Sequence, residues 1–125
     1  MRRWCLLGWM LLLLGCQVNE ADVPELQTEE AQQIGSTSVV MGAEIKEIGP
    51  VKPVNYGFLW DTQSDITIAN AKNKIILGST SDPRKFSVKL DKLSPSTLHY
   101  YRGFAANGDY SKIYYGNVVA FTTLP

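Results

Sequence analysis

Short runs in which apolar and polar residues alternate recur over most of this chain, and turn residues separate them. In the clearest run, 39–45, the odd-numbered positions are Val39, Met41, Ala43 and Ile45. Alternation places successive side chains on opposite faces of a strand, so each such run predicts a strand with one buried face. No segment shows a convincing helical repeat of apolar residues. The pattern therefore predicts an all-β chain.

Seven segments are predicted to be strands: 23–28, 39–45, 54–60, the short apolar run 75–77, 86–90, 98–106 and 112–123. Asn107-Gly108, between the last two, is a strong hairpin signal. Seven alternating strands in about a hundred residues favour an antiparallel sandwich. The expected core consists of Val39, Met41, Ile45, Phe58, Trp60, Val88, Leu90, Leu93, Val119 and Phe121.

The first residues of the chain have the parts of a secretory signal. Arg2 and Arg3 precede an apolar run over 4–14, which stops at Gly15-Cys16. A short positive head, an apolar core and a small residue before a cut site define such signals. The run is shorter than the roughly twenty residues that span a bilayer. We therefore expect residues 1–15 to be a cleaved signal peptide.

Leu13-Leu14-Gly15-Cys16 resembles the lipobox of bacterial lipoproteins. The resemblance implies cleavage between Gly15 and Cys16 and a covalent lipid, such as palmitate, on Cys16. The alternative is a free thiol near the terminus of an ordinary secreted protein. Cys5 would leave with the signal peptide, so Cys16 would be the single cysteine of the mature chain. An intramolecular disulfide and a cysteine metal cluster would then be excluded.

The charge balance of the mature chain argues against nucleic-acid binding. Without Arg2 and Arg3, ten basic residues remain against twelve acids, a formal net charge of −2. That balance lacks the basic excess of nucleic-acid-binding domains. Residues 16–30 carry five acids and no base, which is typical of a solvated, extended tether. Acids in this place also resemble an export signal of surface-exposed lipoproteins of the Bacteroidetes.

Several short motifs resemble those of fibronectin type III domains. Leu93-Ser94-Pro95-Ser96-Thr97, which leads into Tyr100-Tyr101-Arg102, resembles the corner before the sixth strand of that family. Three further marks resemble the variety found in Bacteroidetes lipoproteins: a proline-led first strand that ends in Thr28, Tyr56-Gly57-Phe58, and Tyr115-Gly116-Asn117 ahead of Phe121-Thr122-Thr123. The resemblance covers roughly residues 23–124 and implies a seven-stranded, immunoglobulin-like sandwich. The expected organisation is a signal peptide (1–15), a lipidated polar tether (16–22) and a fibronectin type III-like domain (23–125).

His99 departs from the family pattern, because the corner tyrosine would fall at this position. That tyrosine bonds its hydroxyl to backbone upstream. We expect His99 to face inward and to offer a ring nitrogen to the same backbone, or Tyr100 to replace it after a register shift. A structural role is expected, rather than catalysis or metal binding.

The sequence contains few residues that could carry out catalysis or bind a metal ion. Nucleophilic catalysis needs a base beside the nucleophile, and His99 is the only histidine. The acid pairs Glu44/Glu47 and Asp61/Asp65 adjoin no aromatic cleft. Residues 61–72 begin like a calcium loop but lack its glycine and its final glutamate. We therefore predict a protein that is not an enzyme, with no metal and no cofactor besides the lipid.

Aromatic residues provide the only candidate contact surface. If His99 and Tyr101 face inward, Tyr100 and Phe104 lie on the outer face of their strand. Tyr110, Tyr114 and Tyr115 lie on the following hairpin. Exposed aromatics can stack on sugars or anchor a protein partner. The alternative is cross-strand pairing that only stabilises the sheet.

Together these features predict a non-enzymatic, lipid-anchored envelope protein whose sandwich is a protein-binding or spacer module at the cell surface. The alternative is a carbohydrate-binding accessory lipoprotein of a polysaccharide-uptake system. The expected partners are a membrane, through the lipid on Cys16, and an envelope protein or a glycan. The expected location is the bacterial cell envelope, at the outer membrane, with the membrane face and the oligomeric state left open.

Overall fold

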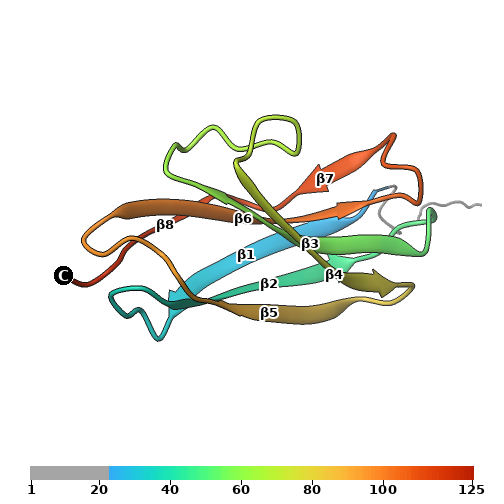
Figure 1. Cartoon of the computed structure of the whole chain (residues 1–125). Coiled ribbons are helices and arrows are strands. Elements are labelled where there is room, and N and C mark those ends of the chain that lie inside the picture. Colours follow the sequence, from blue (N-terminus) through green and yellow to red (C-terminus); the bar gives the residue numbers. More distant parts are fainter. Residues whose placement is uncertain (1–22) are drawn as a thin grey trace, which may run out of the picture.

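The computed structural model describes residues 23–125. The predicted signal peptide, its cleavage point at Gly15, the lipidated Cys16 and the tether 16–22 therefore lie outside the described residues. Eight strands follow one another (Figure 1): β1 (Glu25–Gln32), β2 (Val39–Glu47), β3 (Val54–Asp61), β4 (Asn73–Thr80), β5 (Arg84–Leu90), β6 (Leu98–Ala106), β7 (Ile113–Tyr115) and β8 (Val119–Thr122). Within this part of the chain, no helix is long and apolar enough to cross a membrane.

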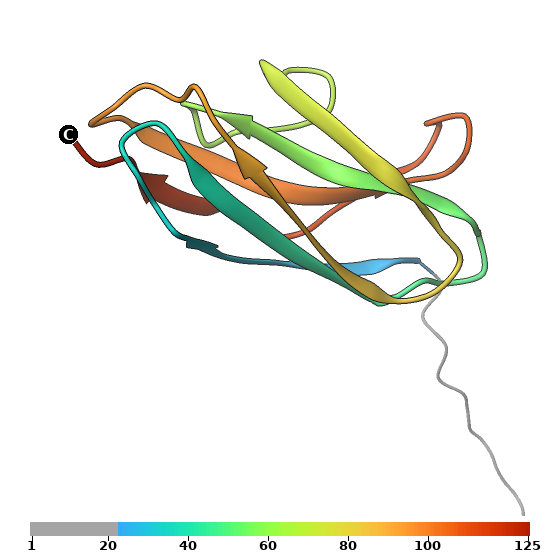
Figure 2. The ribbon, with the colours of Figure 1, turned by 60° about the horizontal axis from the view of Figure 1, so that its bottom comes forward.

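The strands form two antiparallel sheets that pack face to face (Figure 2). One sheet has the order β1-β2-β5, and the other has the order β4-β3-β6-β7, with β8 also paired to β6. The predicted all-β, antiparallel sandwich is thus confirmed, and each of the seven predicted segments overlaps a strand. The first strand does not end at Thr28 as predicted, because β1 pairs with β2 as far as Gln32. The last segment is divided into β7 and β8 by Gly116, Asn117 and Val118.

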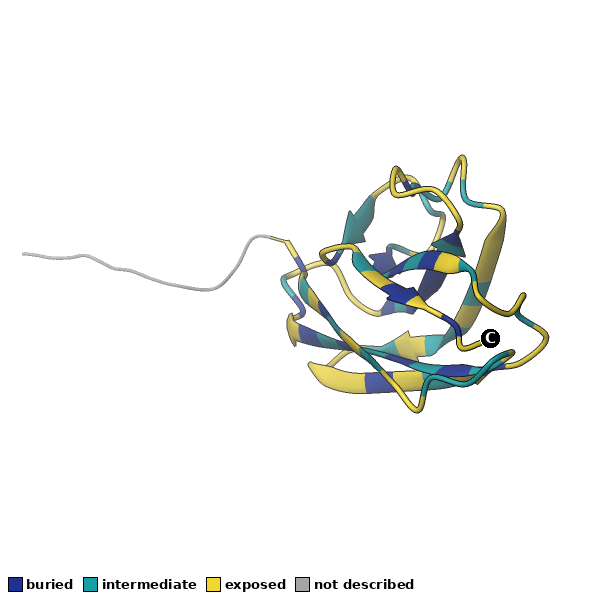
Figure 3. Cartoon of the chain, turned by 90° about the vertical axis from the view of Figure 1, so that its left-hand side faces the viewer, coloured by how far each residue is buried: buried dark blue, intermediate teal, exposed yellow. Residues whose placement is uncertain are grey.

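The core lies between the sheets, as the end-on view in Figure 3 shows. Its centre is aromatic: the ring of Phe58 lies 5.1 Å from that of Phe86 and 6.0 Å from that of Tyr101. All ten predicted core residues belong to this layer. Trp60, Val88, Leu93 and Val119 are half-buried at its margin, and the other six are buried. The alternation of the sequence therefore identified the core correctly.

The start of β1 and the C-terminus lie at opposite ends of the sandwich. β1 begins at one end, and the C-terminus lies at the other (Figures 1 and 2). Because neighbouring strands are antiparallel, the loops 33–38, 62–72 and 91–97 gather at the end that holds the C-terminus. We call this the distal end.

Candidate functional site

The loop 62–72 covers part of the predicted aromatic surface. Phe104 lies on the outer face of β6, but it is fully buried, in a second cluster with Leu59, Ile66 and Ala106. The prediction that Phe104 faces solvent is therefore wrong. The side of the strand was predicted correctly, but Ile66, from a loop that looks polar in sequence, packs over that side.

Three tyrosines surround this second cluster and are half-buried: Tyr100, Tyr110 and Tyr115. The Tyr115 hydroxyl accepts a hydrogen bond from the Ile68 backbone N–H at 3.0 Å. The guanidinium of Arg102 lies 4.7 Å from the centre of the Tyr115 ring and donates to the carbonyl oxygens of Ile66 and Gly116 at 2.9 and 2.7 Å. Burial lowers the pKa of Arg102, which nevertheless stays charged. These side chains hold the loop on the sheet.

Tyr114 lies on the other face of the sheet. It pairs with Ala105, which belongs to the core between the sheets, whereas Tyr115 pairs with Phe104 on the outer face. Paired residues of antiparallel strands project to the same side. The five predicted contact residues therefore do not form one continuous surface.

The carboxylate of Asp61 accepts hydrogen bonds from both ends of the loop 62–72. Its side chain is 2% exposed, Oδ1 accepts from the Thr62 N–H at 2.6 Å, and Oδ2 accepts from the Lys72 N–H at 3.1 Å. Burial raises the pKa of Asp61, but the hydrogen bonds from Lys72 and Thr62 outweigh it and hold the pKa below its usual value. Asp65 is exposed, so the pair Asp61/Asp65 is not a buried acid pair.

His99 faces inward, as predicted, and is 5% exposed. Its ring stacks on Phe121, with centroids 5.2 Å apart and an interplanar angle of 24°. However, Nε2 is buried and has no hydrogen-bond partner. The predicted hydrogen bond from a ring nitrogen to the corner backbone is therefore not made by Nε2.

Thr123 and Tyr101 make the bonds that were expected of His99. The Thr123 hydroxyl accepts from the Thr97 N–H at 2.9 Å and donates to the Ser94 carbonyl at 2.6 Å, which closes the corner before β6. The Tyr101 hydroxyl donates to the backbone carbonyl of Glu29 on the opposite sheet. Burial, with the nearby charges of Glu29 and Glu30, raises the pKa of Tyr101 to about 12. Thr123 is 3% exposed, and no local sequence pattern indicated its role.

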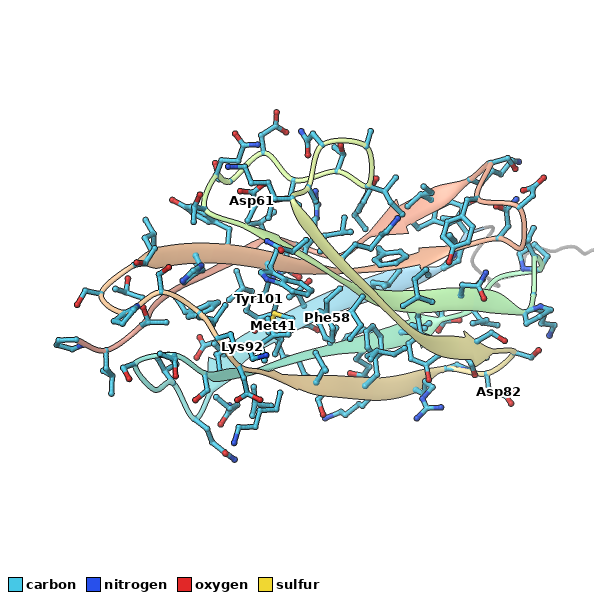
Figure 4. All side chains as sticks on the ribbon, viewed as in Figure 1. Met41, Phe58, Asp61, Asp82, Lys92 and Tyr101 are labelled. Atoms are coloured by element: carbon cyan, nitrogen blue, oxygen red, sulfur yellow. The ribbon has the colours of Figure 1, made fainter. Side chains whose placement is uncertain are left out.

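A cavity of about 320 Å³ lies beside His99 at the distal end. Residues 60–62 and 72–73, at the junction of β3 and β4, form one wall. Residues 91–94, after β5, form the other wall, and Asp61 and Lys92 mark the two walls in Figure 4. We call this the His99 cavity.

A groove of about 600 Å³ lies between β1 and β8, where the edges of the two sheets meet. The side chain of Asn117 bonds the backbone of Thr28 at one end of this edge, and the Leu124 N–H donates to the Gly35 carbonyl at 3.0 Å at the other. Within residues 23–125, no three His, Cys, Asp or Glu side chains are grouped so that they could hold a metal ion.

No protein-family model and no curated protein matches the sequence. Solved structures do match the fold. The sensor domain of the anti-sigma factor RsgI4 from Pseudobacteroides cellulosolvens superimposes with a TM-score of 0.63 at 19% identity, over 82% of this chain and 76% of that one. A shorter form of that domain gives a TM-score of 0.59 at 18% identity, over 81% of this chain and 94% of the other.

The fibronectin type III domain of human fibronectin type III domain containing protein 3 gives a TM-score of 0.54 at 16% identity, over 86% of this chain and 90% of that one. At identities of 16–19%, these similarities show the fold alone. The chain has the β-sandwich fold of fibronectin type III and immunoglobulin-like domains.

Proposed function

We propose that this chain is a non-enzymatic lipoprotein of the bacterial cell envelope, of the Bacteroidetes type, whose sandwich is a protein-binding or spacer module at the cell surface. The observation that carries the proposal is the motif Leu13-Leu14-Gly15-Cys16 ahead of a single β-sandwich. A lipid on Cys16 would attach the chain to the outer membrane, and the acidic residues that follow would keep the tether extended.

The direction of the strands supports this arrangement. β1 is the first strand after the tether in sequence, and it starts at one end of the sandwich. The loops of the distal end lie at the opposite end (Figure 2). The longest strands, β2 and β6, have nine residues each. At about 3.3 Å per residue, such strands are about 30 Å long. A membrane-anchored domain of this kind would present its distal loops well away from the lipid.

Fractionation of cells that express the full chain tests the anchor. We expect the wild-type protein in the outer membrane, with Cys16 as the lipidated N-terminus. The variant Cys16→Ser should be soluble or unprocessed, because several acyl chains are needed for stable attachment. Cys5→Ser is the matched control and should fractionate like the wild type. Mass spectrometry that finds an unmodified Cys16 thiol in native membranes would overturn the lipoprotein proposal.

Experiments on the membrane-anchored protein can distinguish a protein-binding module from a spacer. If the sandwich binds a protein, cross-linking and pull-down from its own membrane should recover one reproducible partner. Substitutions in the loops 33–38 or 91–97 should then weaken recovery. If it is only a spacer, no partner should be enriched over the Cys16→Ser control.

A further inference from the structure

The end of the sandwich where β1 starts has one apolar loop. Within residues 23–125, three loops lie at this end: 48–53, 81–83 and 107–112. Among them, only the loop 48–53 carries a large apolar side chain that is exposed, Val51 at 42%. Val23, just before β1, is 44% exposed. Exposed apolar residues are normal when they are scattered, but they mark an interaction surface when they lie together.

Gly49 brings the loop 48–53 into contact with Val23. Its φ is +73°, a conformation that favours glycine, and a Cβ at this position would lie 3.1 Å from the carbonyl carbon of Val23. The preceding residue, Ile48, is buried in the core and fixes the base of the loop. The exposed residues of the loop therefore form one surface with the start of the described chain. We call it the proximal surface: Val23, Pro50, Val51 and Lys52.

The charges around the proximal surface are balanced. Lys46 and Lys52 are exposed, and so are Glu25 and Glu47, which pair with each other across β1 and β2. The flexible stem of a lysine can lie along apolar groups while its ammonium reaches a phosphate. Valines with lysines beside them suit the boundary between lipid headgroups and water, and the balance of charge requires no anionic lipid.

The length of the predicted tether keeps this surface close to the lipid. Seven residues, 16–22, precede Val23 in the expected mature chain. Fully extended they would reach about 25 Å, and a flexible chain of that length averages about 15 Å. Both lengths are shorter than the strands of the sandwich, so the proximal surface is the part of the domain that meets the membrane first.

We propose that the proximal surface lies against the membrane, with Val51 and Val23 at the level of the lipid headgroups and Lys52 at their phosphates. This inference rests on the proposed lipid anchor, because two valines are too small an apolar surface to hold a protein on a membrane. The sandwich then leans on the end of β1 and β2. The hairpin 107–112, at the same end but with Asp109 at its tip, stays in water.

Labels at single cysteines test this orientation in the lipoprotein purified from cells that express the full chain. Val51→Cys carries an environment-sensitive fluorophore on the proximal surface. Gly108→Cys is the control at the same end, since a Cβ there meets no atom within 4 Å, and Leu98→Cys, at a position that is 45% exposed, is the control at the distal end. The vesicles contain phosphatidylethanolamine, phosphatidylglycerol and a lipid with a quencher on its headgroup.

The label at 51 should shift its emission to shorter wavelengths and be quenched, whereas the labels at 108 and 98 should emit as they do in water. Equal quenching at 51 and 108 would mean that no particular surface faces the lipid, and the proposal would be wrong. In a chain labelled at Val23→Cys, Val51→Asp should abolish the shift. Ile76→Asp, at a position that is 48% exposed on β4, is the matched control and should leave the shift unchanged.

Flotation of the same vesicles distinguishes a failure of this proposal from a failure of the anchor. If the protein floats with the vesicles but the label at 51 stays in water, the anchor holds and the membrane contact is wrong. If the protein does not float, the anchor is wrong, and the proposed contact is overturned with it.

Discussion

The side-chain amide of Asn117 hydrogen-bonds the backbone of Thr28, 89 residues earlier in the chain, as a residue of a neighbouring strand would. Its Oδ1 accepts from the Thr28 N–H at 2.9 Å, and its Nδ2 donates to the Thr28 carbonyl at 3.2 Å. The neighbouring Gly116 makes this approach feasible, since a Cβ there would lie 2.6 Å from Thr28 Oγ1. The first strand of one sheet is thus fixed to the last segment of the other by a side-chain amide.

Replacing Asn117 with alanine should lower the free energy of unfolding by about 1–3 kcal/mol, because the buried backbone groups of Thr28 lose both partners. Urea unfolding measures the change. Val118→Ala, at an exposed neighbouring position, should stay within about 0.5 kcal/mol of the wild type. Equal midpoints for Asn117→Ala and Val118→Ala would show that this link contributes nothing to stability.

Phe104→Ala should destabilise the protein by about 3–5 kcal/mol, as expected for a buried phenylalanine in a packed cluster. An exposed contact residue would instead change stability little. Calorimetric unfolding distinguishes the two outcomes. Hydrogen exchange should also show faster exchange in the loop 62–72, because Ile66 loses its packing partner. A thermal midpoint equal to that of the wild type would place Phe104 at the surface after all.

The strands and the core could be predicted from the sequence because alternation reports directly which face of a strand is buried. Val39, Met41 and Phe58 are examples, and all lie between the sheets. The burial of Phe104 could not be predicted in the same way. Alternation places it on the outer face correctly, but it does not show that Ile66 covers that face.

His99 shows a second limit. Its inward position followed from strand parity, but the hydrogen bonds expected of it are made by residues at other positions, one of them far away in sequence. Thr123 reaches the corner from beyond β8, 26 residues after Thr97, and no local pattern indicates that pairing. Gly57, in the motif Tyr56-Gly57-Phe58, has a structural reason to be glycine. A Cβ there would lie 1.9 Å from the Ile75 carbonyl oxygen, at the irregularity between β3 and β4.

Asp61→Ala should release both ends of the loop 62–72 and cost about 1.5–3 kcal/mol, since hydrogen bonds to a charged acceptor are lost. Amide exchange at Thr62 and Lys72 should become faster. Because the pKa of Asp61 is lowered in the folded protein, its contribution is present above about pH 4 and is lost as the pH falls further. Urea unfolding at pH 7 and pH 3 should therefore show a smaller difference for the variant than for the wild type. Asp65→Ala, in the same loop but exposed, is the control and should behave like the wild type.

Tyr101 should make the fold sensitive to alkali. Its pKa is raised to about 12 in the folded protein, whereas an unfolded tyrosine ionises near pH 10. The unfolded chain therefore loses this proton first, and the stabilising contribution of Tyr101 is intact below about pH 10 and declines as the pH rises towards 12. Tyr101→Phe removes the hydroxyl that donates to the Glu29 carbonyl, which should cost about 0.5–1.5 kcal/mol at pH 7. The variant should then lose less stability than the wild type between pH 9.5 and pH 11.5 in urea unfolding. Parallel losses in the two proteins would mean that the buried hydroxyl of Tyr101 does not govern alkaline unfolding.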